Sequence, residues 1–126
     1  MKATWLYTGI RVKNLDESVK FYTGLLGMKE TGRSSIQATG GTVVGLKSVE
    51  GGQELELNYY PRGNKYATRY TDGEGLDHLA FKVDDLDKAL TEFAKAGHRA
   101  VLEIEGSSSR WAYVKDPNGI WIELFA

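Results

Sequence analysis

Apolar and polar residues alternate along several short segments of the chain. In residues 53–60 (QELELNYY), Leu55 and Leu57 alternate with Glu54 and Glu56, and residues 120–125 (IWIELF) repeat the pattern. Successive side chains of a β-strand point to opposite faces of its sheet, so this alternation predicts strands with one buried face. The expected strands are residues 7–12, 42–49, 53–60, 77–83, 100–105, 110–116 and 120–125.

Two other segments carry apolar residues at helical spacing, and each follows a residue that caps helices. The first begins after Asn14, which has Glu17 three residues further on, and it stops at Gly27. The second begins after Asp85 and stops at Gly97. The expected apolar stripes are Leu15, Val19, Tyr22 and Leu26 in the first helix, and Leu86, Leu90, Phe93 and Ala94 in the second.

The two halves of the chain have the same order of elements. An offset of 71 residues aligns Tyr7 with His78, and an offset of 67 aligns Glu56 with Glu123. A unit of one strand, one helix and three strands is therefore expected twice. This predicts an α+β fold of two tandem βαβββ modules with curved mixed sheets. The expected boundaries are a first module over about residues 1–60, a connector over about 61–75 and a second module over about 76–126, all in a single domain.

The polar faces of the expected strands carry the candidate chemistry. Each helix covers the apolar face of its sheet, which leaves Tyr7 and Glu56 on the other face of the first module. The repeat places His78 and Glu123 equivalently in the second module, and we expect all four at one concave face. Glu56, His78 and Glu123 are nitrogen and oxygen ligands suited to Zn, Ni, Co, Mn or Fe(II). The alternative is that the glutamates are solvated strand residues and that His78 is a hydrogen-bonded core histidine.

Composition narrows the class of protein. The chain has 126 residues, a net charge of −1 and 26% charged residues of both signs, which gives no electrostatic case for nucleic acid or an anionic membrane surface. No apolar run approaches the roughly 20 residues of a membrane span. The absence of cysteine excludes disulfides and thiolate metal ligands. We therefore expect a cytoplasmic protein that acts on a small molecule, with no nucleic-acid or membrane partner.

Four segments together resemble the vicinal oxygen chelate superfamily, and within it most closely the glyoxalase I (lactoylglutathione lyase) family. They are LYTGIRVKNLDESVKFYTGLLGMKE, LELNYYP, GLDHLAFKVDDLDKAL and DPNGIWIELFA. The resemblance covers almost the whole chain and implies two βαβββ modules around a cup that holds a divalent metal. It implies that Glu56, His78 and Glu123 are metal ligands. The fourth ligand of that family is usually histidine, and this sequence has Tyr7 there.

The resemblance also implies a mechanism. Glu123 would remove a proton from C1 of a hemithioacetal, and Glu56 would return a proton at C2 of the resulting enediolate. Arg11 matches an arginine that contacts the carboxylate of the thiol cosubstrate glutathione, whereas Tyr60 stands where the family usually has asparagine. Tyr60, Trp111 and Trp121 complete the expected substrate-binding set with Arg11. The connector carries Arg62, Lys65 and Arg69, which are either solvated or cover an anionic substrate.

Two other functions stay open at this point. One is a different metal-dependent reaction of the superfamily, such as that of an epimerase, dioxygenase or thiol transferase. The other is a metal-free binding protein whose cup holds a small aromatic or cationic ligand between aromatic walls. Those walls would be Trp5, Tyr7, Trp111, Trp121 and Phe125. The resemblance implies a homodimer in every case.

Overall fold

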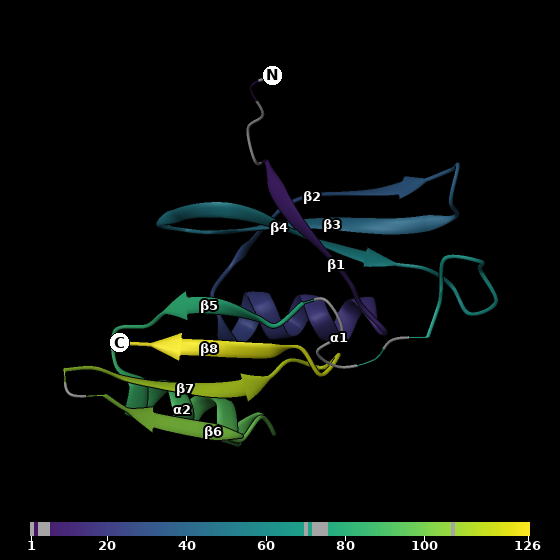
Figure 1. Cartoon of the computed structure of the whole chain (residues 1–126). Coiled ribbons are helices and arrows are strands. Elements are labelled where there is room, and N and C mark those ends of the chain that lie inside the picture. Colours follow the sequence, from purple (N-terminus) through teal and green to yellow (C-terminus); the bar gives the residue numbers. More distant parts are fainter. Residues whose placement is uncertain (1, 3–5, 70, 72–75, 107) are drawn as a thin grey trace. The chain divides into compact units, whose positions relative to one another are not determined.

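A computed structural model describes residues 2, 6–69, 71, 76–106 and 108–126 of the chain (Figure 1). The chain divides into two compact units, Met1–Arg69 and Tyr70–Ala126. Each unit contains one four-stranded sheet and a helical segment that follows its first strand. The predicted α+β fold with two βαβββ modules is therefore confirmed.

The first unit begins with β1 (Tyr7–Arg11), followed by α1 (Leu15–Lys20) and the π-helical segment η1 (Phe21–Leu25). Three strands follow, β2 (Lys29–Ile36), β3 (Gly41–Ser48) and β4 (Gly51–Tyr59). The strand order in the sheet is β1-β4-β3-β2. β1 and β4 are parallel, and the other two pairs are antiparallel.

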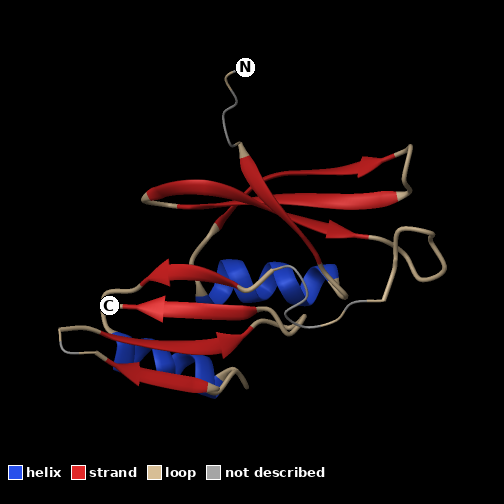
Figure 2. Ribbon diagram, in the orientation of Figure 1, coloured by secondary structure: helices blue, strands red, loops and turns tan. Residues whose placement is uncertain are grey.

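The second unit repeats this topology (Figure 2). It consists of β5 (His78–Lys82), α2 (Leu86–Lys95), β6 (Leu102–Glu105), β7 (Arg110–Lys115) and β8 (Trp121–Phe125). The strand order is β5-β8-β7-β6, with β5 and β8 parallel. α2 contacts β7, as α1 contacts β4 in the first unit.

The strand register confirms the internal repeat residue by residue. Gly9 of β1 lies opposite Glu56 of β4, and Ala80 of β5 lies opposite Glu123 of β8. The two glutamates therefore occupy equivalent places in their sheets. In both units a residue with little or no side chain stands across from the glutamate, which leaves space beside the carboxylate.

The capping residues begin both helices as predicted. Asn14 Oδ1 accepts a hydrogen bond from the N–H of Glu17 at 3.0 Å, and Asp85 Oδ1 accepts one from the N–H of Lys88 at 3.0 Å. Both helical segments end at a glycine with positive φ, 66° at Gly27 and 92° at Gly97. This left-handed conformation is unfavourable for a residue with a Cβ atom, so glycine ends the helix there.

The first helix differs from the prediction in its second half. The stripe from Leu15 to Leu26 predicts one α-helix, but the α-helix ends at Lys20 and gives way to η1. The Thr23 hydroxyl donates to the carbonyl of Val19 at 2.7 Å, and so competes with the backbone N–H for that acceptor. The π-helix is rare and occurs mostly as single turns within α-helices, and η1 is such a turn. The buried face continues through it, because Tyr22 is fully buried.

β2 is a strand that the alternation did not predict. Its eight residues, KETGRSSI, are all exposed, and the strand pairs only with β3 at the edge of the sheet. A strand with no buried face has no apolar period, so its position depends on hydrogen bonds to its neighbour rather than on its own pattern. The other expected strands are present, with ends that differ by up to two residues.

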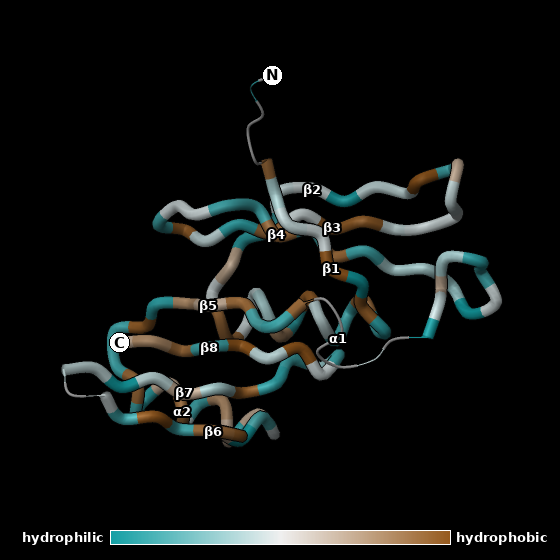
Figure 3. Tube along the Cα trace, viewed as in Figure 1, coloured by the Kyte–Doolittle hydropathy of each residue, from teal (hydrophilic) through white to brown (hydrophobic). Residues whose placement is uncertain are grey.

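The core of each unit lies between the sheet and its helix. Hydropathy changes from residue to residue along the strands, as the alternation predicted (Figure 3). Leu57 of β4 and Ile122 and Leu124 of β8 are fully buried, whereas Glu56 and Glu123 between them are half-buried on the opposite face. The buried apolar residues are Ile10, Val12, Phe21, Tyr22, Met28, Val44, Leu46, Leu55 and Leu57 in the first unit, and Leu86, Phe93, Ala112, Val114, Ile120, Ile122 and Leu124 in the second.

A buried polar turn, residues 116–119 (DPNG), leads into β8. Asp116 Oδ1 accepts hydrogen bonds from the N–H groups of Asn118 and Ile120, each at 2.8 Å, and Oδ2 accepts one from Asn118 Nδ2 at 2.8 Å. Asp116 is 4% exposed and Asn118 is 1% exposed. Asp116 thus accepts hydrogen bonds from three donors that are buried from water. These bonds determine where β8, the strand that carries Glu123, begins.

Replacing Asp116 with alanine tests this role. Asp116→Ala leaves buried N–H groups without an acceptor, so we expect the free energy of unfolding to fall by about 3 kcal/mol. Urea titration followed by circular dichroism measures the change. Asp84→Ala removes an exposed aspartate and is the control, with an expected change within about 0.5 kcal/mol. Equal changes in the two variants would contradict the structural role of Asp116.

Candidate active site

The second unit brings two of the predicted metal ligands into direct contact. His78 is the first residue of β5, and Glu123 lies near the middle of the adjacent strand β8. His78 Nε2 is 3.1 Å from Glu123 Oε2. The two side chains are 34% and 19% exposed, so the pair is shielded on one side and open to a ligand on the other.

Asp77 contacts the other nitrogen of the same imidazole. His78 Nδ1 lies 2.7 Å from Asp77 Oδ1. With Nδ1 donating to that carboxylate, a neutral His78 presents its Nε2 lone pair on the side of Glu123. A histidine that binds metal nearly always donates its second ring N–H in this way. Asp77 was not among the residues predicted from the sequence, although its place directly before His78 in LDHLAF was the available signal.

Tyr113 of β7 is a further contact of Glu123. The two residues are register partners in the β7–β8 pair, and the Tyr113 hydroxyl donates to Glu123 Oε2 at 3.2 Å. Partial burial, and next the hydrogen bond to Glu123, raise the pKa of Tyr113 above its ordinary value. Tyr113 therefore stays protonated and able to donate at neutral pH. Tyr113 lies on an expected strand, but the sequence pattern predicted no role for it.

The predicted tryptophans lie around this pair on the same face of the sheet. Trp121 is the register partner of His78, and its ring is 5.5 Å from the Tyr113 ring. The Tyr113 ring also meets the His78 ring edge-on, at 5.6 Å between centroids. Trp111 precedes Tyr113 by two residues on β7, and both tryptophans are half-buried. His78 and Glu123 thus lie beside a partly open aromatic wall.

In the first unit, Tyr7 and Glu56 share one face of the sheet. Tyr7 is the register partner of Glu54, and Gly9 is the partner of Glu56 two residues further on. A Cβ atom at Gly9 would lie 4.0 Å from Glu56 Oε1 and 3.2 Å from Asn58 Nδ2. Tyr7 is 48% exposed, and Glu56 is half-buried. The equivalence predicted between this pair and His78 with Glu123 holds for their places in the strands.

Arg11 and Tyr60, two predicted substrate-binding residues, line one pocket of the first unit. The pocket has a volume of about 420 Å³, and its other lining residues are Gly9, Ile10, Asn58, Lys65, Tyr66 and Thr68. Arg11 Nη1 donates a hydrogen bond to Thr68 Oγ1. Lys65 Nζ lies 5.0 Å from the centre of the Tyr66 ring, and that ring is 5.6 Å from Tyr60. The pocket therefore combines two cations with two aromatic rings.

The wall of this pocket is part of the predicted connector, and it is anchored to the β2–β3 turn. Asn64 Nδ2 donates to the carbonyl of Thr39 at 2.7 Å. The Tyr60 ring packs on Gly41, where a Cβ atom would lie only 2.7 Å from the ring. The three basic residues expected to be solvated or to cover a substrate, Arg62, Lys65 and Arg69, are all exposed, and Lys65 also lines the pocket. Residues 70 and 72–75 of the connector, and Trp5, lie outside the described residues.

The geometry of His78 and Glu123 fits two neighbouring ligands of one ion. Nitrogen and oxygen ligands that lie about 2.1 Å from one ion are roughly 3.0–3.5 Å apart. The observed Nε2–Oε2 distance is 3.1 Å. Within the described residues of either unit, three or more His, Asp or Glu side chains do not gather closely enough to hold a metal by themselves. The four predicted ligands are divided two and two between the units, so the complete set stays a prediction.

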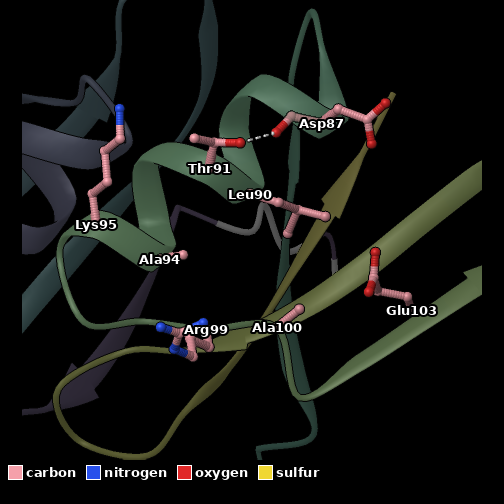
Figure 4. Close-up of a pocket in the computed structure, with 8 residues that line it drawn as sticks. All are labelled: Asp87, Leu90, Thr91, Ala94, Lys95, Arg99, Ala100 and Glu103. Atoms are coloured by element: carbon pink, nitrogen blue, oxygen red, sulfur yellow. Dashed lines mark hydrogen bonds between the residues drawn. The ribbon is translucent and has the colours of Figure 1, made fainter.

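Another pocket lies between α2 and β6, away from every predicted site residue (Figure 4). Asp87 and Glu103 lie towards one side of it, and Lys95 and Arg99 towards the other. Leu90, Thr91, Ala94 and Ala100 complete the lining. The Thr91 hydroxyl donates to the carbonyl of Asp87 at 2.9 Å, a bond within the helix. This pocket offers no arrangement of groups for catalysis.

Among the described helices, none has the length and apolar character of a membrane span.

Known proteins resemble nearly the whole chain. A probable lactoylglutathione lyase of Vibrio parahaemolyticus is 34% identical over 94% of this chain and 87% of its own length. The lactoylglutathione lyase of Haemophilus influenzae is 32% identical over 94% of this chain and 89% of its own length. The solved structure of the trypanothione-dependent glyoxalase I of Leishmania major is 33% identical, with a TM-score of 0.79 over 98% of this chain and 86% of that one.

The model of the glyoxalase/bleomycin resistance protein/dioxygenase superfamily matches residues 5–124, which include the four predicted ligand positions and the pocket of Arg11. The resemblance drawn from the sequence is therefore confirmed at the level of the superfamily. The chain belongs to the glyoxalase/bleomycin resistance protein/dioxygenase superfamily.

Proposed function

We propose that this protein is a metal-dependent lyase of the glyoxalase I type, which converts a hemithioacetal or a similar small α-oxo substrate through an enediolate. The observation that carries the proposal is the His78–Glu123 contact at 3.1 Å, with Asp77 on the far nitrogen of the imidazole. Relatives named lactoylglutathione lyase, 32–34% identical over most of the chain, support the choice of reaction.

His78, Glu123 and Glu56 are the proposed ligands of a divalent ion (Ni, Zn, Co, Mn or Fe), with Tyr7 at the fourth position. When bound, the ion supplies Lewis acidity to the oxygens of the substrate. The equivalent register of Glu56 and Glu123 supports this set. Asp77 would keep the proton of His78 on Nδ1, so that Nε2 is available as a ligand.

The carboxylates supply the proton transfers of the proposed reaction. Glu123 would take the proton from C1 of the hemithioacetal, and the electron pair left behind forms the enediolate. Glu56 would deliver one proton to C2, while the hydroxyl proton at C1 passes to the oxygen on C2, so the product is an isomer of the substrate. Trp111 and Trp121 would limit the access of water on the side of Glu123, since both are half-buried on that face.

The pocket of Arg11 and Tyr60 is the proposed site for the thiol part of the substrate. Its two cations, Arg11 and Lys65, suit a carboxylate such as those of glutathione. Tyr60 and the neighbouring Tyr66 would pack on the less polar part of the same thiol. The resemblance to the superfamily also supports a homodimer and a cytoplasmic location as parts of the proposal.

A metal-free binding protein is the second candidate, because the cluster of Tyr113, Trp121 and His78 supports it. These rings lie 5.5–5.6 Å apart and would stack on an aromatic or cationic ligand. Tyr7 at a position where the family usually has histidine favours the same function. The two candidates differ in whether the protein binds metal.

Metal content separates the metal-dependent lyase from the metal-free binding protein. Purified without chelators, the wild type should hold close to one divalent ion per chain, and Glu123→Ala should lose most of it, because it removes a ligand atom. Elemental analysis by inductively coupled plasma mass spectrometry measures both. Glu103→Ala removes an exposed glutamate of β6 and should keep the wild-type content. A wild type without metal, even after loading with each candidate ion, would exclude the metal-dependent lyase and support the metal-free binding protein.

Turnover tests the reaction itself. With methylglyoxal and glutathione at saturating metal, we expect Glu123→Gln to lower kcat by at least about 100-fold, because an amide cannot accept the C1 proton. Formation of the thioester is followed by its ultraviolet absorbance, with Glu103→Gln as the matched control. Unchanged kcat in Glu123→Gln would exclude this glutamate as the base. A metal-loaded wild type with no turnover would point to another reaction of the superfamily.

Arg11→Gln tests the thiol pocket. Loss of the guanidinium removes a charged hydrogen-bond donor, so KM for the hemithioacetal should rise about tenfold or more. The value of kcat should change little, because the contact is the same in the ground and transition states. Arg99→Gln, in the pocket between α2 and β6, is the matched control. A KM equal to that of the wild type would exclude Arg11 from substrate binding.

A further inference from the structure

Two side chains of the second unit contact Glu123 Oε2. His78 Nε2 lies 3.1 Å away on one side, and the Tyr113 hydroxyl donates to the same oxygen at 3.2 Å. His78 is in turn held by Asp77 at 2.7 Å. The four side chains form a continuous series of contacts from Asp77 through His78 and Glu123 to Tyr113.

The position of the Tyr113 hydroxyl is well determined by its surroundings. Tyr113 lies directly across from Glu123 in the β7–β8 pair, so the sheet sets the separation of the two backbones. The ring meets the His78 ring at an interplanar angle of 86° and the Trp121 ring at 57°. Contacts to two different rings restrict the ring of Tyr113 and thus the direction of its hydroxyl.

We infer that Tyr113 is a positioning residue, whose hydroxyl holds the Glu123 carboxylate beside His78 Nε2. The inference rests on the proposed function, in which Glu123 is both a ligand and the base. A carboxylate oxygen has two lone pairs, so Oε2 can accept from Tyr113 and still face an ion that His78 also binds. Oε1 then keeps its own lone pairs for the proton of the substrate.

The role of the Tyr113 hydroxyl can be tested separately from the packing of the Tyr113 ring. Tyr113→Phe keeps the contacts of the ring with His78 and Trp121 and removes the hydroxyl, which donates to Glu123 and also interacts with the Trp111 side chain. A role confined to packing would therefore survive this substitution, whereas a positioning role would not. Tyr59→Phe removes one hydroxyl from a half-buried strand residue of the first unit and is the matched control.

The first measurement is metal affinity, by competition with a chromophoric chelator for Zn and Ni. Loss of a hydrogen bond to a ligand typically weakens metal binding 10–100-fold, so we expect the Kd of Tyr113→Phe to rise about tenfold. The visible absorption spectrum of the Co-loaded protein should change as well, since Glu123 is held differently. Tyr59→Phe should match the wild type in both. A wild-type Kd and spectrum in Tyr113→Phe would overturn the inference.

The second measurement needs no metal. Urea unfolding of the metal-free wild type, Tyr113→Phe, Glu123→Ala and the double variant forms a double-mutant cycle. If Tyr113 acts through Glu123, the effects of the two substitutions are not additive, because Glu123→Ala already removes the acceptor. Additive effects would overturn the inference. A coupled cycle in a wild type that takes up no metal would support the contact and overturn the proposed function, so the two failures are distinguishable.

Discussion

The parallel pairing of the first and last strands of each unit is the constraint on which this structure depends. Parallel neighbours cannot be joined by a tight turn, so a helix and two antiparallel strands lie between them in the chain. The helix covers one face of the sheet. The other face is left to the polar side chains of the paired strands. In the second unit those strands are β5 and β8, and their polar side chains include His78 and Glu123.

This arrangement explains why the candidate chemistry is built from residues 45 positions apart in the chain, with one contribution from each end of the unit. The DPNG turn, residues 116–119, stabilises this arrangement at the start of β8. Asp116 pairs three buried donors at the start of β8, which determines where the alternation of that strand begins. A shift of one residue would turn Glu123 into the core and Ile122 out of it.

Membership of a superfamily with several reactions does not decide the reaction of this chain, because function resides in the site and not in the fold. The proposed site differs at two positions from the family pattern that the sequence resembles. Tyr7 replaces the usual first histidine, and Tyr60 replaces the usual asparagine. The second change adds an aromatic ring, and Tyr60 packs against Gly41 and near Tyr66. The proposed thiol pocket of this chain is therefore more aromatic than the family pattern implies.

The sequence by itself determined the repeat, the capped starts of both helices and the face of each strand on which Glu56, His78 and Glu123 lie. These features depend on local periodicity and on turn residues such as Gly97. Each such signal lies within a single short segment of the sequence. Only the tertiary structure decided that Asp77 and Tyr113 contact the His78–Glu123 pair, that β2 exists, and that the first helix changes to a π-helical turn. The physical reason is that a contact between strands depends on the register between them, which the alternation within a single strand does not encode.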